Sequence, residues 1–454
     1  MIYIVLFFSL MFIACGEVDE GKVPSDRPDP LEQEFYYNYR LLKAYFYRPD
    51  SIKDYSEYGD LTEVDSMYSS LNDYLKGWRY TRYYKPDTAD NVFQGLVSSE
   101  KYYSFGFERG VEKETLTIDD EVVTSYTLVV TDVYPFSPAT DAGLKKYDKL
   151  LSANGVSLAG ITDTNLVKIY LRSDTLFEST TVFEVLRGTE SKSLPAMEKK
   201  EVREPTVFLD SVRGIPYIFV TRFTQETNNP QGTYFEFKEY LNEIKGAKTA
   251  IIDLRYNPGG TISHCTAMAA ELVPLNSELV YDEVHYQNGS GKNVVENQHY
   301  YARDYLNGKG AGTDIKWIIL MSRGSASCSE RFIAAVKYNR PSEVILVGEN
   351  SYGKGIGQVY GYTILEGLFN ITALQSYYPD GRTFHLDGIP PDIDVNPTDN
   401  DALINAIEIV ARHFDPGMAL AKRSVAPAKP DTMPPVRKSK KTDFEMYHLL
   451  HEWK

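Results

Sequence analysis

A serine lies in a stretch of very small residues, between an apolar run typical of a buried strand and a helical pattern. Residues 317–321 form that run, residues 324–330 read GSASCSE, and the helical pattern continues to Val336. Such a turn would present Ser327 where the first backbone N–H groups of a helix have no helical partner. Those groups and the positive end of the helix dipole would stabilise an oxyanion beside Ser327. The pattern predicts a nucleophilic serine, and on its own it also fits a simple N-cap cluster.

A lysine flanked by glycines follows a second apolar run, Val344–Val347, in residues 348–358, which read GENSYGKGIGQ. A serine hydroxyl is a poor nucleophile until a base removes its proton. Neutral lysine can do this where burial lowers its pKa from about 10.4 towards about 7–8, a shift of roughly 4 kcal/mol that a water-poor pocket can supply. We therefore expect Lys354 to be the base, and the rate of the reaction to rise with pH as Lys354 loses its proton. Gln358 could orient the amine without adding charge.

A third turn, NPGG at residues 257–260, follows the apolar run Thr249–Leu254 and precedes a helical pattern around residues 264–272. This turn would expose backbone amides at the carboxyl end of a strand, the edge where open α/β sheets bind ligands. An N–H from Gly259 or Gly260 could join that of Cys328 as two donors to one oxyanion. An ordinary glycine-containing loop is the alternative interpretation.

The elements around these turns alternate between strand and helix from Thr206 to about Pro397. Ile215–Val220 is typical of a strand, and one helix face is formed by Phe237, Tyr240, Leu241 and Ile244. The alternation indicates an α/β core with mostly parallel strands. The N-terminal part from Leu31 to about Tyr84 is helical and tyrosine-rich. Its apolar face, which we interpret as core packing, consists of Met67, Leu71, Tyr74, Leu75 and Trp78.

Residues 102–194 contain strand-type runs around the segment SPATDAGLKKYDKLLSANG at residues 137–155. This segment resembles a bacterial PDZ domain, although Tyr147 stands where that family usually has Gly. PDZ domains bind extended peptides by adding a strand to a sheet edge, with backbone amides receiving the terminal carboxylate. The resemblance implies a carboxylate-binding loop at Phe105, Gly106 and Phe107. A small β-domain that only braces the core is the alternative.

The PDZ-like segment is followed along the chain by NPGG, GSASCSE, GENSYGKGIGQ and then YPDGRTFHLDGIPPDIDV at residues 378–395. Together, in this order, these motifs resemble the carboxyl-terminal processing (tail-specific) serine peptidases. The resemblance implies a ClpP/crotonase-like α/β core, a preceding or inserted PDZ domain and an N-terminal helical region. It also implies that Ser327 is the nucleophile, Lys354 the base and Gln358 the third member of a triad. The implied activity is endopeptidase cleavage through an acyl-enzyme, on proteins engaged by their C-termini, with no metal or cofactor. Cys328 replaces the family's usual Ala.

The composition and the N-terminus bear on partners and compartment. The chain has 454 residues and a net charge of −15, which argues against a general nucleic-acid binder, and three Cys and seven His show no disulfide framework or zinc pattern. Residues 2–14 are almost wholly apolar but too short to span a bilayer, as in a signal peptide. Cys15 follows, which resembles a bacterial lipobox. We expect lipidation at Cys15 and an exported cell-envelope lipoprotein, on the periplasmic side or in the outer membrane, and a plain secretory signal is the alternative.

The predicted domain layout follows these boundaries: signal peptide 1–15, flexible tether 16–30, N-terminal helical region 31–100, PDZ domain 101–200, peptidase core 206–400, and a basic Pro/Lys-rich tail 415–454 with a short C-terminal helix. Four other interpretations fit parts of the sequence. GENSYGK matches half of a phosphate-binding loop, but Gly355 stands where Ser or Thr should be and no helix pattern follows. His264 or His385 could serve a serine–histidine enzyme, but neither is needed beside Lys354. Cys265 and Cys328 could pair, although buried thiols are expected. A catalytically silent peptide-binding or scaffold lipoprotein of the same fold is the rival function.

Overall fold

The computed structural model describes residues 29–74, 80–118, 121–172, 174–288 and 290–418. The chain divides into two compact units, and each is described by itself. The unit that holds the predicted peptidase core, called the peptidase unit below, contains the described residues within 29–97, 209–223 and 237–418; the unit that holds the predicted PDZ domain, called the PDZ unit, contains those within 98–208 and 224–236. The predicted signal peptide, Cys15, most of the tether, Leu75, Trp78 and the basic tail from residue 419 onward lie outside the described residues. Within the described ranges, no helix has the length and apolar character needed to cross a bilayer.

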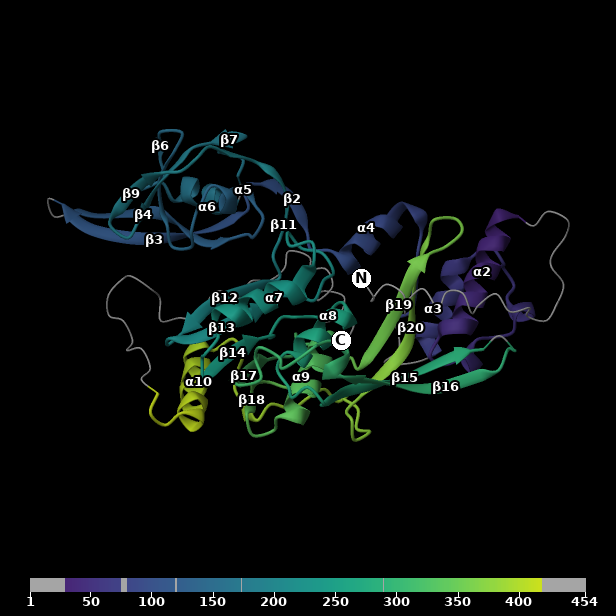
Figure 1. Cartoon of the computed structure of the whole chain (residues 1–454). Coiled ribbons are helices and arrows are strands. Elements are labelled where there is room, and N and C mark those ends of the chain that lie inside the picture. The colour runs from purple at the N-terminus through teal and green to yellow at the C-terminus, as the bar shows by residue number, and fades with distance from the viewer. Residues whose placement is uncertain (1–28, 75–79, 119–120, 173, 289, 419–454) are drawn as a thin grey trace. The chain divides into compact units, whose positions relative to one another are not determined.

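The peptidase unit is built on a sheet with the strand order β12-β13-β14-β17-β18-β21; β12, β13, β14, β17 and β18 are labelled in Figure 1. In this sheet β13, β14, β17, β18 and β21 pair in parallel with their neighbours, as the sequence predicts. Their bounds are β12 Val207–Val212, β13 Ile215–Val220, β14 Thr249–Asp253, β17 Lys316–Met321, β18 Val344–Gly348 and β21 Ile393–Asp394. Every residue of β14 is buried, which explains its unbroken apolar run.

Helices connect or flank these strands: α7 Gly232–Glu243, α8 Ile262–Ala270, α9 Cys328–Asn339 and α10 Asn400–Phe414. The predicted helix after the GSASCSE turn is α9, and its residues Cys328 to Val336 are all buried. In α7 the predicted apolar face is confirmed, because Phe237 and Leu241 are fully buried.

A second sheet, antiparallel, has the order β1-β20-β15-β16, with β19 also paired to β20. Its strands are β1 Arg82–Tyr84, β15 Glu278–Gln287, β16 Asn293–Tyr301, β19 Ile356–Tyr362 and β20 Leu368–Tyr377. No local pattern in the sequence predicts this sheet. The N-terminal part supplies helices α2 Pro30–Tyr45, α3 Val64–Tyr74 and α4 Pro86–Val97, and also β1, so it is not helical throughout. Met67 and Leu71 pack in one apolar cluster with Phe369 and Ile371 of β20.

The PDZ unit has a sheet in the order β3-β4-β5-β8-β9, with β6 paired to β5. The bounds of its elements are β2 Lys101–Ser104, β3 Phe107–Ile118, β4 Glu121–Val133, α5 Pro138–Asp141, β5 Lys149–Ala153, β6 Val156–Ser157, α6 Thr164–Arg172, β7 Thr180–Thr181, β8 Phe183–Arg187, β9 Glu190–Ser193, β10 Met197–Glu198 and β11 Lys200–Arg203. Tyr147, which replaces the family's Gly, adopts a positive φ of 71° with an exposed side chain. The turn therefore keeps the backbone conformation that Gly provides most easily.

Candidate active site

The three predicted loops follow neighbouring parallel strands at the same edge of the sheet. These strands end at Asp253 in β14, Met321 in β17 and Gly348 in β18. Backbone hydrogen bonds then join the loops, because Ala326 N donates to Asn257 O (3.1 Å) and Tyr352 N donates to Ser325 O (3.0 Å). The fold thus brings together NPGG, GSASCSE and the glycine-flanked lysine segment, which lie far apart in the sequence.

Ser327 is the residue from which α9 starts, and its backbone is unusual. It has φ 55° and ψ −113°, a region that side-chain-bearing residues rarely occupy. Such strain is often found at functional sites, where the surrounding structure holds a residue in one orientation. Gly259 packs against this turn so closely that a Cβ there would lie 2.8 Å from the Cβ of Ser327. A side chain at position 259 would therefore displace Ser327.

The serines on either side of Ser327 have structural roles. Ser325 Oγ donates to Leu254 O (2.7 Å), and Ser329 Oγ donates to Asn257 O (2.8 Å). Both are buried, whereas Ser327 is only half-buried. Of the serines in GSASCSE, Ser327 is therefore the one that a ligand can reach.

A buried carboxylate, Glu330, holds the serine and lysine loops together. Its Oε2 accepts the backbone N–H of Ser327 (2.9 Å) and that of Lys354 (2.8 Å). Its Oε1 accepts Gly353 N and Ser351 Oγ (2.6 Å each). The backbone nitrogens of Ser327 and Lys354 can therefore be no further apart than these two hydrogen bonds laid end to end. Burial raises the pKa of Glu330 to about 7, while the four donors favour its ionised form.

Lys354 lies two residues before β19, and Gln358 lies within this strand. Lys354 is half-buried, and its Nζ lies 4.3 Å from the ring centroid of Tyr80, a cation–π contact. Gln358 Nε2 donates a long hydrogen bond (3.4 Å) to Thr372 Oγ1 on β20. A strand follows Lys354 directly, where a phosphate-binding loop needs a helix. This excludes the nucleotide interpretation.

The predicted oxyanion donors lie around Ser327, and the structure distinguishes between them. Gly259 N donates to Asn257 Oδ1 (2.9 Å), so its N–H is already used. Gly260 is thereby the remaining glycine of the predicted pair. It lies beside the helix start, because Cys328 Sγ donates to Gly260 O (3.1 Å). Cys328 opens α9, where the backbone N–H groups have no partner within the helix.

The two histidines and two cysteines considered as alternatives are poorly suited to act as a base or to form a disulfide. Burial lowers the pKa of both His264 and His385 to about 4, so both are neutral near pH 7 and weak as bases. Within the part of the chain that the structure describes, Cys265 and Cys328 are free, buried thiols. Burial raises the pKa of Cys328 well above its usual value. These observations match the expectation of buried thiols.

In the PDZ unit the predicted carboxylate-binding residues form the turn between β2 and β3. Phe105 and Phe107 are buried in the unit's apolar core. Gly106 has φ 78°, and a Cβ there would lie 2.3 Å from the Cβ of Ser137. Gly106 N donates to Ser104 Oγ (3.1 Å). The turn therefore requires Gly106, but its amide faces an internal partner.

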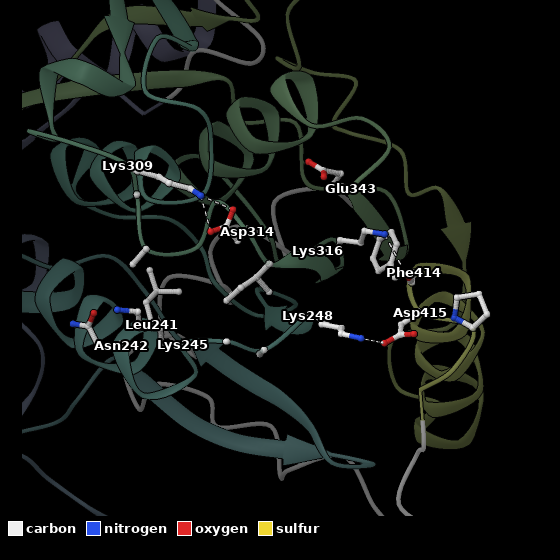
Figure 2. A pocket seen from close by; sticks show the side chains of 16 residues that line it. Leu241, Asn242, Lys245, Lys248, Lys309, Asp314, Lys316, Glu343, Phe414 and Asp415 are labelled. Atoms are coloured by element: carbon white, nitrogen blue, oxygen red, sulfur yellow. Dashed lines mark hydrogen bonds and ion pairs between the residues drawn. The ribbon is translucent and has the colours of Figure 1, made fainter.

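A cavity of about 870 Å³ lies away from these loops, near the beginnings of β14 and β17. Figure 2 shows its polar walls, where Lys248 pairs with Asp415 (3.0 Å) and Lys309 with Asp314 (2.5 Å). Lys316 donates to the carbonyl of Phe414 (3.0 Å). This cavity is at the strand edge opposite the serine and carries none of the predicted residues. In the described residues no group of His, Cys, Asp and Glu could hold a metal ion.

Glu330, Asn257 and Tyr80 belong to the site, although no role for them is predicted from the sequence. Glu330 has a sequence signal, because Ser327-x-x-Glu330 has the spacing of a helix capping box. Asn257 belongs to the NPGG motif, but nothing in that motif predicts that it bonds Gly259, Ala326 and Ser329. Tyr80 lies in the N-terminal part, where no pattern indicates proximity to Lys354.

Comparisons with known proteins agree with this architecture. The model of peptidase family S41 matches residues 214–395, and the model of the PDZ domain matches residues 98–174. A "Probable CtpA-like serine protease" of Staphylococcus aureus (strain bovine RF122 / ET3-1) is 24% identical over 358 residues. That alignment covers 75% of this chain and 66% of the relative, so the chain spans slightly less than two thirds of the relative's length.

Two solved structures are similar at low identity. The photosystem II D1 C-terminal processing protease has a TM-score of 0.44 and 17% identity, covering 83% of this chain and 97% of that one. An S41 protease structure from Bacteroides fragilis NCTC 9343 has a TM-score of 0.47 and 15% identity, covering 86% of this chain and 99% of that one.

Proposed function

We propose that the chain is a serine endopeptidase of the C-terminal processing type that engages protein C-termini, a proposal supported by the matches of residues 214–395 to peptidase family S41 and of residues 98–174 to the PDZ domain. The observation that carries this proposal is the half-buried Ser327 at the start of α9, whose backbone N–H and that of Lys354 are both bonded to the Glu330 carboxylate. No observation favours the silent binding protein over the enzyme.

The proposed reaction begins with attack of Ser327 Oγ on a peptide carbonyl, while neutral Lys354 Nζ takes the hydroxyl proton. The oxyanion is stabilised by backbone N–H groups of Gly260 and Cys328, assisted by the α9 dipole. Lys354 then donates its proton to the leaving amine, and an acyl-enzyme forms on Ser327. Water, deprotonated by Lys354, hydrolyses this ester. Throughout, Gln358 orients the side-chain amine of Lys354.

Glu330 is a positioning residue in this scheme, since it contacts neither the scissile bond nor the reacting atoms. Four hydrogen bonds to its carboxylate fix the turns that carry Ser327 and Lys354. Two reacting groups that belong to separate loops lose far less orientational freedom when one rigid acceptor holds both. Substrate selection is assigned to the PDZ unit, by strand addition along β3.

The test is cleavage of an unfolded protein with a free C-terminus, followed by mass spectrometry of the products. Ser327→Ala is expected to abolish cleavage while binding of C-terminal peptides is retained. Ser329→Ala is the matched control, because this serine on the same turn donates to a backbone carbonyl. It should keep measurable activity. Normal cleavage by Ser327→Ala would refute the nucleophile, and absence of cleavage by the wild type with intact binding would favour the scaffold function.

The compartment is part of the proposal, with Cys15 as the lipid attachment site of an exported envelope lipoprotein. Its support is the apolar run before Cys15 in the sequence. Cys15→Ser is expected to move the protein from the membrane fraction to the soluble fraction and to prevent labelling by a fatty acid analogue. An unchanged membrane fraction would contradict the anchor.

A further inference from the structure

The PDZ unit contains a buried ion pair, Arg109–Asp174. Arg109 Nη1 lies 2.5 Å from Asp174 Oδ1, and only 6% of the arginine side chain and 12% of the aspartate side chain are exposed. The guanidinium lies between the rings of Phe107 and Phe177, 5.1 Å from each centroid. A charge removed from water in this way requires a partner of opposite sign.

The aspartate of this pair also contacts the predicted carboxylate-binding loop. Ser104 Oγ donates to Asp174 Oδ2 (2.6 Å) and accepts the N–H of Gly106 (3.1 Å). The amide expected to face a peptide carboxylate is thus linked, through one hydroxyl, to an internal carboxylate. Lys199 Nζ fixes the loop that bears this carboxylate, with hydrogen bonds of 2.8 Å to the carbonyls of Asp174 and Phe177.

The arginine retains some unused binding capacity. Within the described ranges its Nε has no hydrogen-bond acceptor, whereas its Nη1 faces Asp174 Oδ1 in the ion pair. A guanidinium presents several N–H donors in a planar fork that matches a carboxylate. Arg109 lies on β3, which is the end strand of its sheet and therefore offers the edge that strand addition requires. The ion pair holds the guanidinium in place but leaves part of its fork unfilled.

We propose that Asp174 is an internal competitor for the peptide carboxylate, and that a bound C-terminus displaces it from Ser104 and Arg109. The inference rests on the proposed role of the PDZ unit in reading C-termini and adds the residues that set its affinity. Arg109 receives the incoming carboxylate, so one anion replaces another and the buried guanidinium is never left without a counter-charge. Peptides that lack a terminal carboxylate cannot make this exchange.

The test uses the full chain carrying Ser327→Ala, so that peptides are bound but not cleaved. The probes are short fluorescein-labelled peptides randomised at their last positions, as free acids and as C-terminal amides, and binding is measured by anisotropy. Asp174→Asn is expected to tighten free-acid binding about 3- to 10-fold and to leave amide binding unchanged. Glu190→Gln is the control, because Glu190 pairs with Lys192 on the surface of the same unit (2.9 Å). Unchanged or weaker free-acid binding by folded Asp174→Asn would overturn the proposal.

A second variant covers the case in which Asp174→Asn fails to fold. Arg109→Met combined with Asp174→Leu replaces the pair by apolar side chains, a change that buried ion pairs often tolerate. It should bind acids and amides equally. Persistence of the acid preference in this variant would also overturn the proposal. If the Ser327→Ala parent itself shows no preference for free-acid peptides, the proposed binding of C-termini by the PDZ unit is wrong. If the parent shows this preference and neither variant alters it, only the proposed role of Asp174 as a competitor is wrong.

Discussion

Glu330 in the peptidase unit is a fully buried carboxylate, and Asp174 in the PDZ unit is a largely buried one; each lies beside a loop that could bind an anion. Glu330 lies behind its loop, where it accepts N–H groups of Ser327 and Lys354 and leaves the serine hydroxyl accessible. Asp174 instead bonds the hydroxyl and the guanidinium that an incoming carboxylate would use. One carboxylate organises a site, and the other competes for one. The partners of a buried acid, more than its burial, decide which of these it does.

The largest expected effect separates catalysis from binding. Lys354→Arg keeps the positive charge but removes the base, because a guanidinium does not lose its proton at accessible pH. Cleavage should fall by about 10²- to 10⁴-fold, the usual contribution of general base catalysis, with peptide binding unchanged. Steady-state kinetics and anisotropy measure the two properties. Lys309→Arg, at an exposed lysine of the same unit, should alter neither. Near-normal cleavage by Lys354→Arg would contradict the base.

The next effect concerns the organising carboxylate. Glu330→Gln replaces four charge-assisted hydrogen bonds by an amide that can accept only part of them. We expect kcat for a short amidated peptide to fall about 10- to 100-fold, which corresponds to about 1.4–2.8 kcal/mol. Glu236 is the matched control, since burial also raises its pKa to about 7 and Thr206 and Thr227 bond it within the PDZ unit. If Glu236→Gln reduced kcat equally, the loss would reflect general destabilisation.

The pH dependence should show opposite signs for activity and stability. Protonation of Glu330 below its pKa of about 7 removes at least one hydrogen bond to the catalytic turns, so cleavage should rise about tenfold between pH 6 and 8. Glu330→Gln should lose the part of this rise that comes from Glu330 and keep the part that comes from deprotonation of Lys354. The folded-state pKa lies above the unfolded value near 4.5, so the folded state retains a proton that the unfolded chain has released. The contribution of Glu330 to the free energy of unfolding should therefore fall from pH 4.5 to 7, by on the order of 3 kcal/mol. Because Glu236, His264 and His385 also titrate over this range, the contribution is measured by urea denaturation as the difference between Ser327→Ala and Ser327→Ala combined with Glu330→Gln. A difference that grows with pH would contradict the assignment.

The smallest effect is expected next to the nucleophile. Cys328 contributes its backbone N–H to the proposed oxyanion site, while its Sγ donates to Gly260 O. Cys328→Ala should therefore change kcat by less than about 3-fold, because a neutral thiol hydrogen bond contributes little. Gly260→Ala is the contrasting variant, since a Cβ there would meet Phe223 O at 1.9 Å. A large loss in Cys328→Ala would assign the thiol a role of its own.

Much of the peptidase unit could be predicted from local patterns. The strand Ile215–Val220 and the helix after GSASCSE have strong signals, because apolar runs and small-residue turns are read directly from neighbouring residues. The antiparallel sheet could not be predicted in this way. Its pairing of Arg82–Tyr84 with β20 joins segments from opposite ends of the chain, and no local pattern specifies the partner of a strand.

Glu330 and Asp174 also differ in how far the sequence predicts their contacts. Glu330 carries a local signal, the capping-box spacing from Ser327, although its bonds to Gly353 and Lys354 do not follow from it. Asp174 carries no signal, since its partners Ser104 and Arg109 lie on other elements and each is an unremarkable residue in the sequence.

The sequence alone determined which residues could react and the order of their motifs, since nucleophile, base and glycine turns are properties of residue type and near neighbours. The tertiary structure decided which serine remains accessible, which glycine amide is already bonded and which carboxylate faces which loop. These depend on parallel strands bringing distant loops to one edge, and on burial, which makes every hydrogen-bond donor and acceptor find a partner within reach. Only the folded chain defines those partners.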